Sequence, residues 1–171
     1  VTGASIFMAT DRVVNEALDG LMVQSIASFQ RTVHQRIEDL LQTHREEAEL
    51  LAARPDLAAA VAAGDADAVR AIVVPAMRSM GVEAITVANA QGVVVARAHS
   101  DKRGDSVQKQ ANVARALRGE VSAGVEPGTV IPFSLRAGAP LRLDGRIVGA
   151  VTVGMSLTAE SFVDDIKALT G

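Results

Sequence analysis

Five polar side chains stand at alternating positions in three segments that have the composition of β-strands. They are two guanidiniums, one imidazole and two hydroxyls, from Arg97, His99, Ser134, Arg136 and Thr152. Successive side chains of a strand point to opposite faces, so the polar residues of each segment share one face and the apolar residues between them share the other. If the three polar sets meet in one sheet, their chemistry suits a carboxylate, because arginine offers a two-pronged fork and the other groups add hydrogen bonds.

The same pattern has an interpretation that needs no ligand. Antiparallel sheets commonly keep one face in water, and polar residues there require no function. The two interpretations differ in geometry. A binding site requires the five groups to surround one enclosed hollow, whereas a solvated face leaves them spread out, and the residues alone leave this choice open.

The composition excludes several classes of protein and of site. The 171 residues suit a single domain with room for an appended element. There is no cysteine, which removes disulfides, thiolate catalysis and cysteine-based metal sites. With no Trp or Tyr, and with 17 basic against 20 acidic residues, we expect no nucleic-acid partner. His34 and His44 are not spaced as metal ligands on one turn, so we expect no metal and no cofactor.

A long amphipathic helix is predicted over residues 4–53. Apolar or buried-type residues recur there at steps of three or four, at Met22, Ile26, Phe29, Val33, Ile37, Leu40, His44, Ala48 and Leu51. An unbroken helix of about 50 residues would be about 75 Å long. A compact domain of this size is only about 30–40 Å across, so the helix must overhang it. A partner helix or a membrane-proximal stalk would cover the excess.

Turn and capping residues divide the rest of the chain. Pro55 opens a short helix, and Asp65 can cap another that ends near Met80 and that Pro75 should kink. The other expected elements are a hairpin over 83–99, a helix over 107–119, strands on either side of a turn at 127–128, a strand over 147–157 after an Asp-Gly turn, and an exit helix capped by Thr158. The fold class is therefore α+β, with a long N-terminal helix packed on an antiparallel sheet of about five strands.

Ordered phrases across residues 84–157 resemble a known family. They are "ANAQGVVV", "RAH" followed by "RGD", "ALRG", "SLRAGAP" and "DGRIVGAVTVG". In this order they are similar to the extracytoplasmic PAS-like sensor domains called Cache, and more narrowly to the single-Cache type of bacterial chemoreceptors and sensor kinases. The resemblance implies a dimerisation or stalk helix over 1–53, a ligand-binding domain over 54–157 and an exit helix towards the membrane over 158–171. It also implies a periplasmic location in a membrane-anchored protein that dimerises along the long helix.

The resemblance also implies roles for individual residues. "SLRAGAP" is similar to "SLRGKSP" of citrate and dicarboxylate sensor kinases, so Arg136 matches a carboxylate-binding arginine and Gly138 replaces a carboxylate-binding lysine. Thr152 and His99 match ligand-binding positions, and Arg97 is offset by one position from a ligand-binding arginine. Backbone amides of residues 128–132 lie where relatives contact their ligand. With the lysine absent, the expected ligand is a short monocarboxylate such as acetate, propionate or pyruvate, because a di- or tricarboxylate would bury uncompensated charge.

The function implied is that of a sensor domain, and not of an enzyme. We expect a small organic acid to bind in the extracytoplasmic part of a methyl-accepting chemotaxis receptor and to shift the exit helix relative to the long helix. One alternative places the same domain in a histidine kinase or a diguanylate cyclase. Another is a dimeric signalling module that binds no small molecule.

Overall fold

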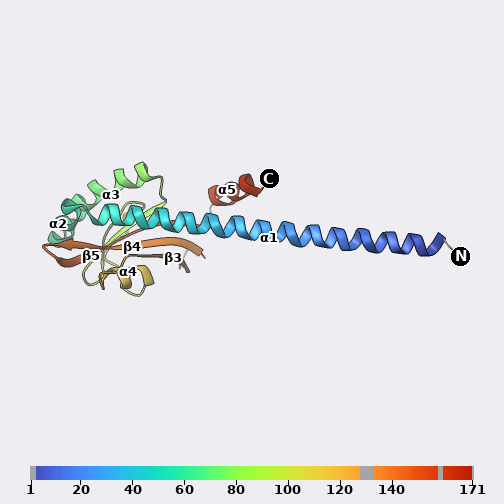
Figure 1. Ribbon diagram of the computed structural model, residues 1–171. Helices are drawn as coiled ribbons and strands as arrows, with labels where there is room; N and C mark the ends of the chain where they lie inside the picture. Colours follow the sequence, from blue (N-terminus) through green and yellow to red (C-terminus); the bar gives the residue numbers. More distant parts are fainter. Residues whose placement is uncertain (1–2, 128–132, 158–159, 171) are drawn as a thin grey trace.

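The computed structural model describes residues 3–127, 133–157 and 160–170. A five-stranded antiparallel sheet has the strand order β2-β1-β5-β4-β3. Its strands are β1 (Ala84–Asn89), β2 (Val94–Arg97), β3 (Ser122–Pro127), β4 (Phe133–Leu143) and β5 (Arg146–Ser156). One face is covered by α1 (Gly3–Ala52), α2 (Pro55–Ala63) and α3 (Ala66–Met80), and α4 (Ala111–Ala116) lies on the other (Figure 1). The α+β class predicted from the sequence is confirmed.

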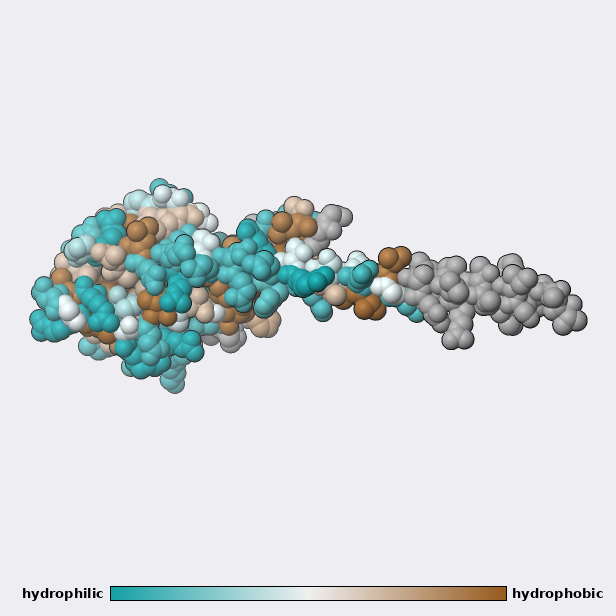
Figure 2. Space-filling view, viewed as in Figure 1, coloured by the Kyte–Doolittle hydropathy of each residue, from teal (hydrophilic) through white to brown (hydrophobic). Residues whose placement is uncertain are grey.

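The helix α1 is 50 residues long and extends far beyond the sheet (Figure 1). Its C-terminal part packs on the sheet, with Ala48 and Leu51 almost fully buried. Along the projecting part, Met22, Ile26 and Phe29 are 61%, 56% and 48% exposed, and apolar surface is visible there in Figure 2. The predicted overhang is therefore confirmed. Within the described residues, no helix combines the length and the apolar content that crossing a bilayer requires.

The last helix, α5 (Glu160–Thr170), follows β5 and runs beside α1 towards the same end of the molecule (Figure 1). An ion pair joins the two helices, with Arg36 Nη2 2.6 Å and Nε 2.7 Å from Asp165 Oδ2. The expected capping role of Thr158 and the expected turn at 127–128 involve residues outside those described. The division of the chain into three functional parts stays a prediction, although α1 ends at Ala52 and β5 ends at Ser156.

Local signals placed the short helices correctly, with one exception. Asp65 accepts a hydrogen bond from the Ala68 N–H at 3.0 Å and so caps α3, which continues through Pro75. The exception is α4, which begins at Ala111 instead of at 107. The reason is tertiary, because the Val107 N–H donates to the Gly92 carbonyl at 2.8 Å and ties this segment to the β1–β2 turn.

The register of the sheet separates an apolar face from a polar one. A single row across all five strands contains Arg97, Thr86, Thr152, Gly138 and Ser122, each paired with the next. Paired residues of antiparallel strands point to the same face. The row one step along contains Ala84, Gly154, Arg136 and Gly124. One face of the sheet is therefore lined by small and polar side chains.

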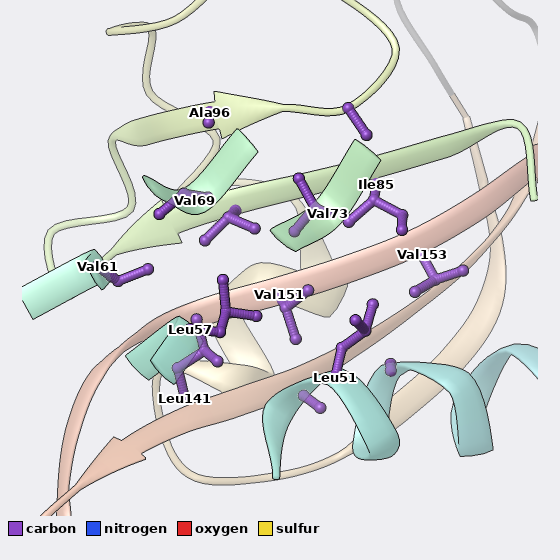
Figure 3. Close-up of a cluster of buried hydrophobic side chains, with 14 of the residues drawn as sticks. Leu51, Leu57, Val61, Val69, Val73, Ile85, Ala96, Leu141, Val151 and Val153 are labelled. Carbon is purple, nitrogen blue, oxygen red and sulfur yellow. The ribbon is translucent and has the colours of Figure 1, made fainter. Parts of the chain in front are cut away.

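The opposite face forms the main core. Figure 3 shows Leu51 of α1, Leu57 of α2 and Val69 and Val73 of α3 pointing towards the strands, where they meet Ile85, Ala96, Leu141, Val151 and Val153. A smaller apolar cluster lies beneath α4 on the polar face, formed by Ala88, Val94, Val107, Val113, Ala116 and Ala150. The helix α4 thus covers one end of the polar face, and the cavity described below opens beyond it.

Candidate functional site

A cavity of about 700 Å³ lies on the polar face of the sheet, and all five site residues predicted from the sequence line it. Three strands bring them together: β2 and its continuation supply Arg97 and His99, β4 supplies Ser134 and Arg136, and β5 supplies Thr152. The segment between β2 and α4 forms the outer wall. The five groups therefore line one cavity, which is partly open to solvent. The binding role of each residue stays a prediction.

Arg136 is the guanidinium that the structure leaves available for a ligand. It is half-buried, and it makes no hydrogen bond or ion pair with any residue in the described part of the chain. Its stem lies over Gly154 of β5, where an added Cβ would stand 3.3 Å from Arg136 Cγ and 2.8 Å from the Leu135 carbonyl oxygen. A glycine at 154 therefore makes the space in which the arginine side chain lies.

Two hydroxyls lie in the cavity wall. Ser134 Oγ donates to the Glu126 carbonyl at 3.3 Å, and Thr152 Oγ1 donates to the Thr86 carbonyl at 3.4 Å. Both side chains belong to buried residues, with exposures of 4% and 8%. These hydrogen bonds are long and therefore weak, so each hydroxyl can turn to a ligand at little cost.

Arg97 is occupied by a partner that the sequence did not identify. Its Nη1 and Nη2 donate to the two carboxylate oxygens of Asp105 at 2.8 and 2.9 Å, and Nη1 also donates to the Lys102 carbonyl at 2.7 Å. The Arg97 side chain is only 12% exposed. These contacts hold the outer wall of the cavity in place, and they leave Arg97 less free than Arg136 to bind a ligand directly.

The Arg97–Asp105 ion pair should make the stability of the domain sensitive to acid. Hydrogen bonding from Arg97 lowers the pKa of Asp105 from 3.8 to about 2. A carboxyl group with a lowered folded-state pKa stabilises the fold above its unfolded pKa and loses that contribution as the pH falls towards the folded value. The fold therefore loses the stabilisation from ionised Asp105 as the pH falls from about 4 to about 2. Because Asp105 is more than a third exposed, solvent screening limits the effect to about 1 kcal/mol or less.

We expect Asp105→Asn to lower the free energy of unfolding at pH 7. Near pH 2 the difference in this free energy between the wild type and the variant should be smaller. The measurement is urea unfolding of both proteins from pH 2 to pH 7. A deficit that stayed constant over this range would show that the pair does not stabilise the folded chain through its charge.

His99 stands where β2 ends, at the mouth of the cavity, and it is exposed. Partial desolvation at the cavity wall lowers the pKa of His99 below its ordinary value, and the positive charges of Arg97 and Arg136 contribute further. The imidazole is therefore mostly neutral at neutral pH. A neutral imidazole has one N–H donor and one acceptor, and hydrogen bonding to the Ile85 backbone acts in the opposite direction by favouring the protonated ring.

Position 138 requires a glycine because the helix α4 packs directly against it. A Cβ built at this position would stand 2.8 Å from the Asn112 carbonyl oxygen and 3.1 Å from the Asn112 carbonyl carbon. The start of α4 therefore occupies the space into which a side chain would grow. A lysine at 138, as in the "SLRGKSP" pattern, has no room here.

Sequence reasoning missed several residues that line the cavity, among them Glu83, Thr86, Lys102 and Asp105. Thr86 had a usable signal, because it is the polar residue that alternates with Ala84 in β1. Asp105 belongs to the "RGD" phrase, although nothing in that phrase identifies its partner. Glu83 gave no signal, and its Oε2 accepts a hydrogen bond from the Ser156 N–H at 2.8 Å. Residues 128–132, expected to supply backbone amides, lie outside those described.

A protein-family model matches residues 23–171. It is dCache_3, described as the double sensory domain of two-component sensor kinases. No curated protein sequence matches the chain. The sequence resemblance to Cache domains is confirmed by this match. The matched model is of the double type, whereas the described residues form one sheet.

Solved structures share the fold. The sensor domain of the V. cholerae histidine kinase DctB has a TM-score of 0.72 and 13% identity, covering 81% of this chain and 57% of that one. The E. coli DcuS sensor domain has a TM-score of 0.65 and 19% identity, with coverages of 77% and 97%. The sensory domain of the Campylobacter jejuni chemoreceptor Tlp3, with isoleucine bound, has a TM-score of 0.58 and 16% identity, with coverages of 93% and 65%. The chain thus spans less than two thirds of the DctB and Tlp3 domains and almost all of the DcuS domain.

Proposed function

The chain belongs to the dCache_3 family of periplasmic sensory domains, and on that premise we propose that it binds a small carboxylate and signals its presence across the membrane. The observation that carries the proposal is the half-buried guanidinium of Arg136, which lines a partly open cavity and has no partner among the described residues. An arginine in such a position binds a carboxylate through two parallel hydrogen bonds. The domain acts in this proposal as a binding module without catalysis.

The cavity favours a single carboxylate with a short apolar tail. The charge of Arg97 is offset by Asp105, and Gly138 has no room for a second cation beside Arg136. Lys102 is exposed at the rim, where water screens its charge. The apolar residue Val107 lines the same space. Acetate, propionate and pyruvate fit this description, whereas citrate would place further charges in the cavity without matching cations.

A second candidate ligand is a small aliphatic amino acid. Glu83 adds a carboxylate to the cavity lining, and a carboxylate is a suitable partner for a ligand ammonium group. Structures of the similar Tlp3 domain are described with isoleucine and with L-valine. In this arrangement the ligand carboxylate would bind Arg136 and the ammonium group would bind Glu83.

Calorimetric titration separates these ligands. We expect acetate, propionate or pyruvate to bind, and citrate to bind more weakly or not at all. Binding of valine together with failure of all three simple acids would favour the amino-acid alternative. Tight binding of citrate with no response to the other compounds would reject the proposal. If none of these compounds binds or raises the melting temperature, the carboxylate proposal fails, and the alternative of a signalling module without a small-molecule ligand is favoured.

We propose that the full-length protein is a membrane-anchored methyl-accepting chemotaxis receptor that works as a dimer along α1. The dimer is supported by the apolar side chains that α1 exposes beyond the sheet, including Ile26 and Phe29. The same domain would serve a histidine kinase or a diguanylate cyclase equally well. The output domain of the full-length protein decides between these three.

Ile26→Glu is expected to weaken self-association of the chain. A charge placed in the seam between two helices loses its hydration, so the dissociation constant should rise about tenfold or more. The measurement is sedimentation velocity over a range of concentrations. Leu50→Glu is the matched control, because Leu50 is 65% exposed on the same helix but lies off the apolar stripe. Equal behaviour of both variants would remove the projecting part of α1 from the interface.

A further inference from the structure

Arg70 of α3 reaches the cavity wall from the other side of the sheet. Its neighbour Val69 is buried in the main core, on the apolar face. The Arg70 guanidinium extends past β2, which is an edge strand. There Nη1 donates to the Arg97 carbonyl at 2.7 Å and to the Ser100 carbonyl at 3.0 Å, and Nη2 lies 3.1 Å from Asp101 Oδ1. Arg70 itself does not line the cavity.

The residues that Arg70 holds begin the outer wall of the cavity. The segment 97–105 contributes His99, Ser100, Lys102 and Asp105 to the lining, besides Arg97. Its far end is fixed to the sheet, since the Val94 N–H donates to the Asp105 carbonyl and the Gly104 N–H donates to the Val94 carbonyl, both at 2.9 Å.

The near end of the segment depends on α3. Ala98 still pairs with β1, through its N–H and the Ile85 carbonyl at 3.0 Å. From His99 to Asp101, the tertiary hydrogen bond that anchors the main chain within the described residues comes from Arg70, and Arg97 anchors the next residue through the Lys102 carbonyl.

We propose that Arg70 is a positioning residue for ligand binding: by fixing the main chain at 97–101 it presets the wall of the cavity that Arg136 also lines. This inference rests on the proposed function. A wall segment that is ordered before binding loses no conformational entropy when the ligand binds, so this entropic cost does not weaken the affinity. An arginine suits the task because one guanidinium spans three acceptors, which a lysine cannot do with the same geometry.

The direct test needs no ligand. Arg70→Gln is compared with Arg78→Gln, which removes an exposed arginine from the last turn of the same helix. We expect the amides of residues 99–102 to exchange faster with solvent in Arg70→Gln, and the amides of β1 and β5 to stay unchanged. Arg78→Gln should match the wild type. Unchanged exchange at 99–102 in Arg70→Gln would overturn the proposal.

A titration of His99 by NMR reports the same event independently. Release of the wall should rehydrate the ring, so the pKa of His99 should rise towards its ordinary value in Arg70→Gln. The other charged groups that line the cavity, Glu83, Arg97, Lys102, Asp105 and Arg136, are present in both proteins. A purely stabilising role of Arg70 would lower the melting temperature without moving the pKa of His99.

The affinity for propionate completes the test. We expect Arg70→Gln to bind propionate about tenfold more weakly, as the loss of one charge-assisted anchor would produce. Arg70→Lys should recover part of the loss, and Arg78→Gln should bind normally. Wild-type affinity in Arg70→Gln would overturn the proposal. If the wild type itself fails to bind propionate, the monocarboxylate function fails, and the exchange and titration results still decide whether Arg70 positions the wall.

Discussion

Arg136→Ala should abolish carboxylate binding and leave the fold intact. The guanidinium has no partner among the described residues, so its removal breaks no internal hydrogen bond or ion pair there. A bound carboxylate would lose its charge-assisted hydrogen bonds and remain in the cavity without a counter-charge. Losses of this kind weaken binding by roughly 100-fold or more. Calorimetric titration with propionate measures the effect, and circular dichroism with thermal unfolding checks the fold.

Arg142→Ala is the matched control for this variant. Arg142 lies on the same strand but is exposed, and among the described residues its one hydrogen bond is a long contact of 3.5 Å to the Gly119 carbonyl. Its replacement should leave binding unchanged. Loss of folding in Arg136→Ala would assign Arg136 a structural role. Full binding by a folded Arg136→Ala protein would remove this residue from the site and with it the main argument for a carboxylate ligand.

Gly138→Lys is expected to destabilise the domain without creating a citrate site. The new Cβ would stand 2.8 Å from the Asn112 carbonyl oxygen, so α4 would have to move away from β4. Overpacking of this kind costs roughly 1–3 kcal/mol. Gly138→Ala should already show most of the loss, because the clash begins at Cβ. Urea unfolding measures the change in stability, and titration with citrate tests for the added cation.

Gly124 provides the control for the glycine substitutions. It lies on β3 in the same sheet, and a Cβ added there meets nothing within 4 Å. Gly124→Ala should therefore change the stability far less than Gly138→Ala. If Gly138→Lys folded with normal stability and bound citrate tightly, the restriction to a single carboxylate would be wrong.

Features that depend on neighbouring residues could be predicted from the sequence. Asp65 caps α3 through its own side chain, and the alternation of polar residues along β2, β4 and β5 assigned five side chains to one face correctly. Their meeting at one cavity also required the register that pairs Thr152 with both Thr86 and Gly138, which the sequence does not specify.

Features that depend on distant contacts could not be predicted. Arg97 had the pattern of a ligand-binding residue, but its partner Asp105 becomes visible only once the segment between them folds back. The reason for glycine at 138 is the approach of α4, from a different part of the chain. Arg70 carried no signal, because two of its three acceptors are main-chain carbonyls, which every residue possesses, and the third, Asp101, is distant in sequence.

The ion pair between Arg36 and Asp165 links α1 to α5. The floor of the cavity includes Gly154, Met155 and Ser156, and α5 begins only four positions later at Glu160. A ligand that displaces this end of β5 by a fraction of an ångström would therefore also displace α5, which is joined to α1 by the ion pair. The signal would be a sliding or tilting of α5 relative to α1. Its direction would depend on which of the two helices the membrane holds more firmly.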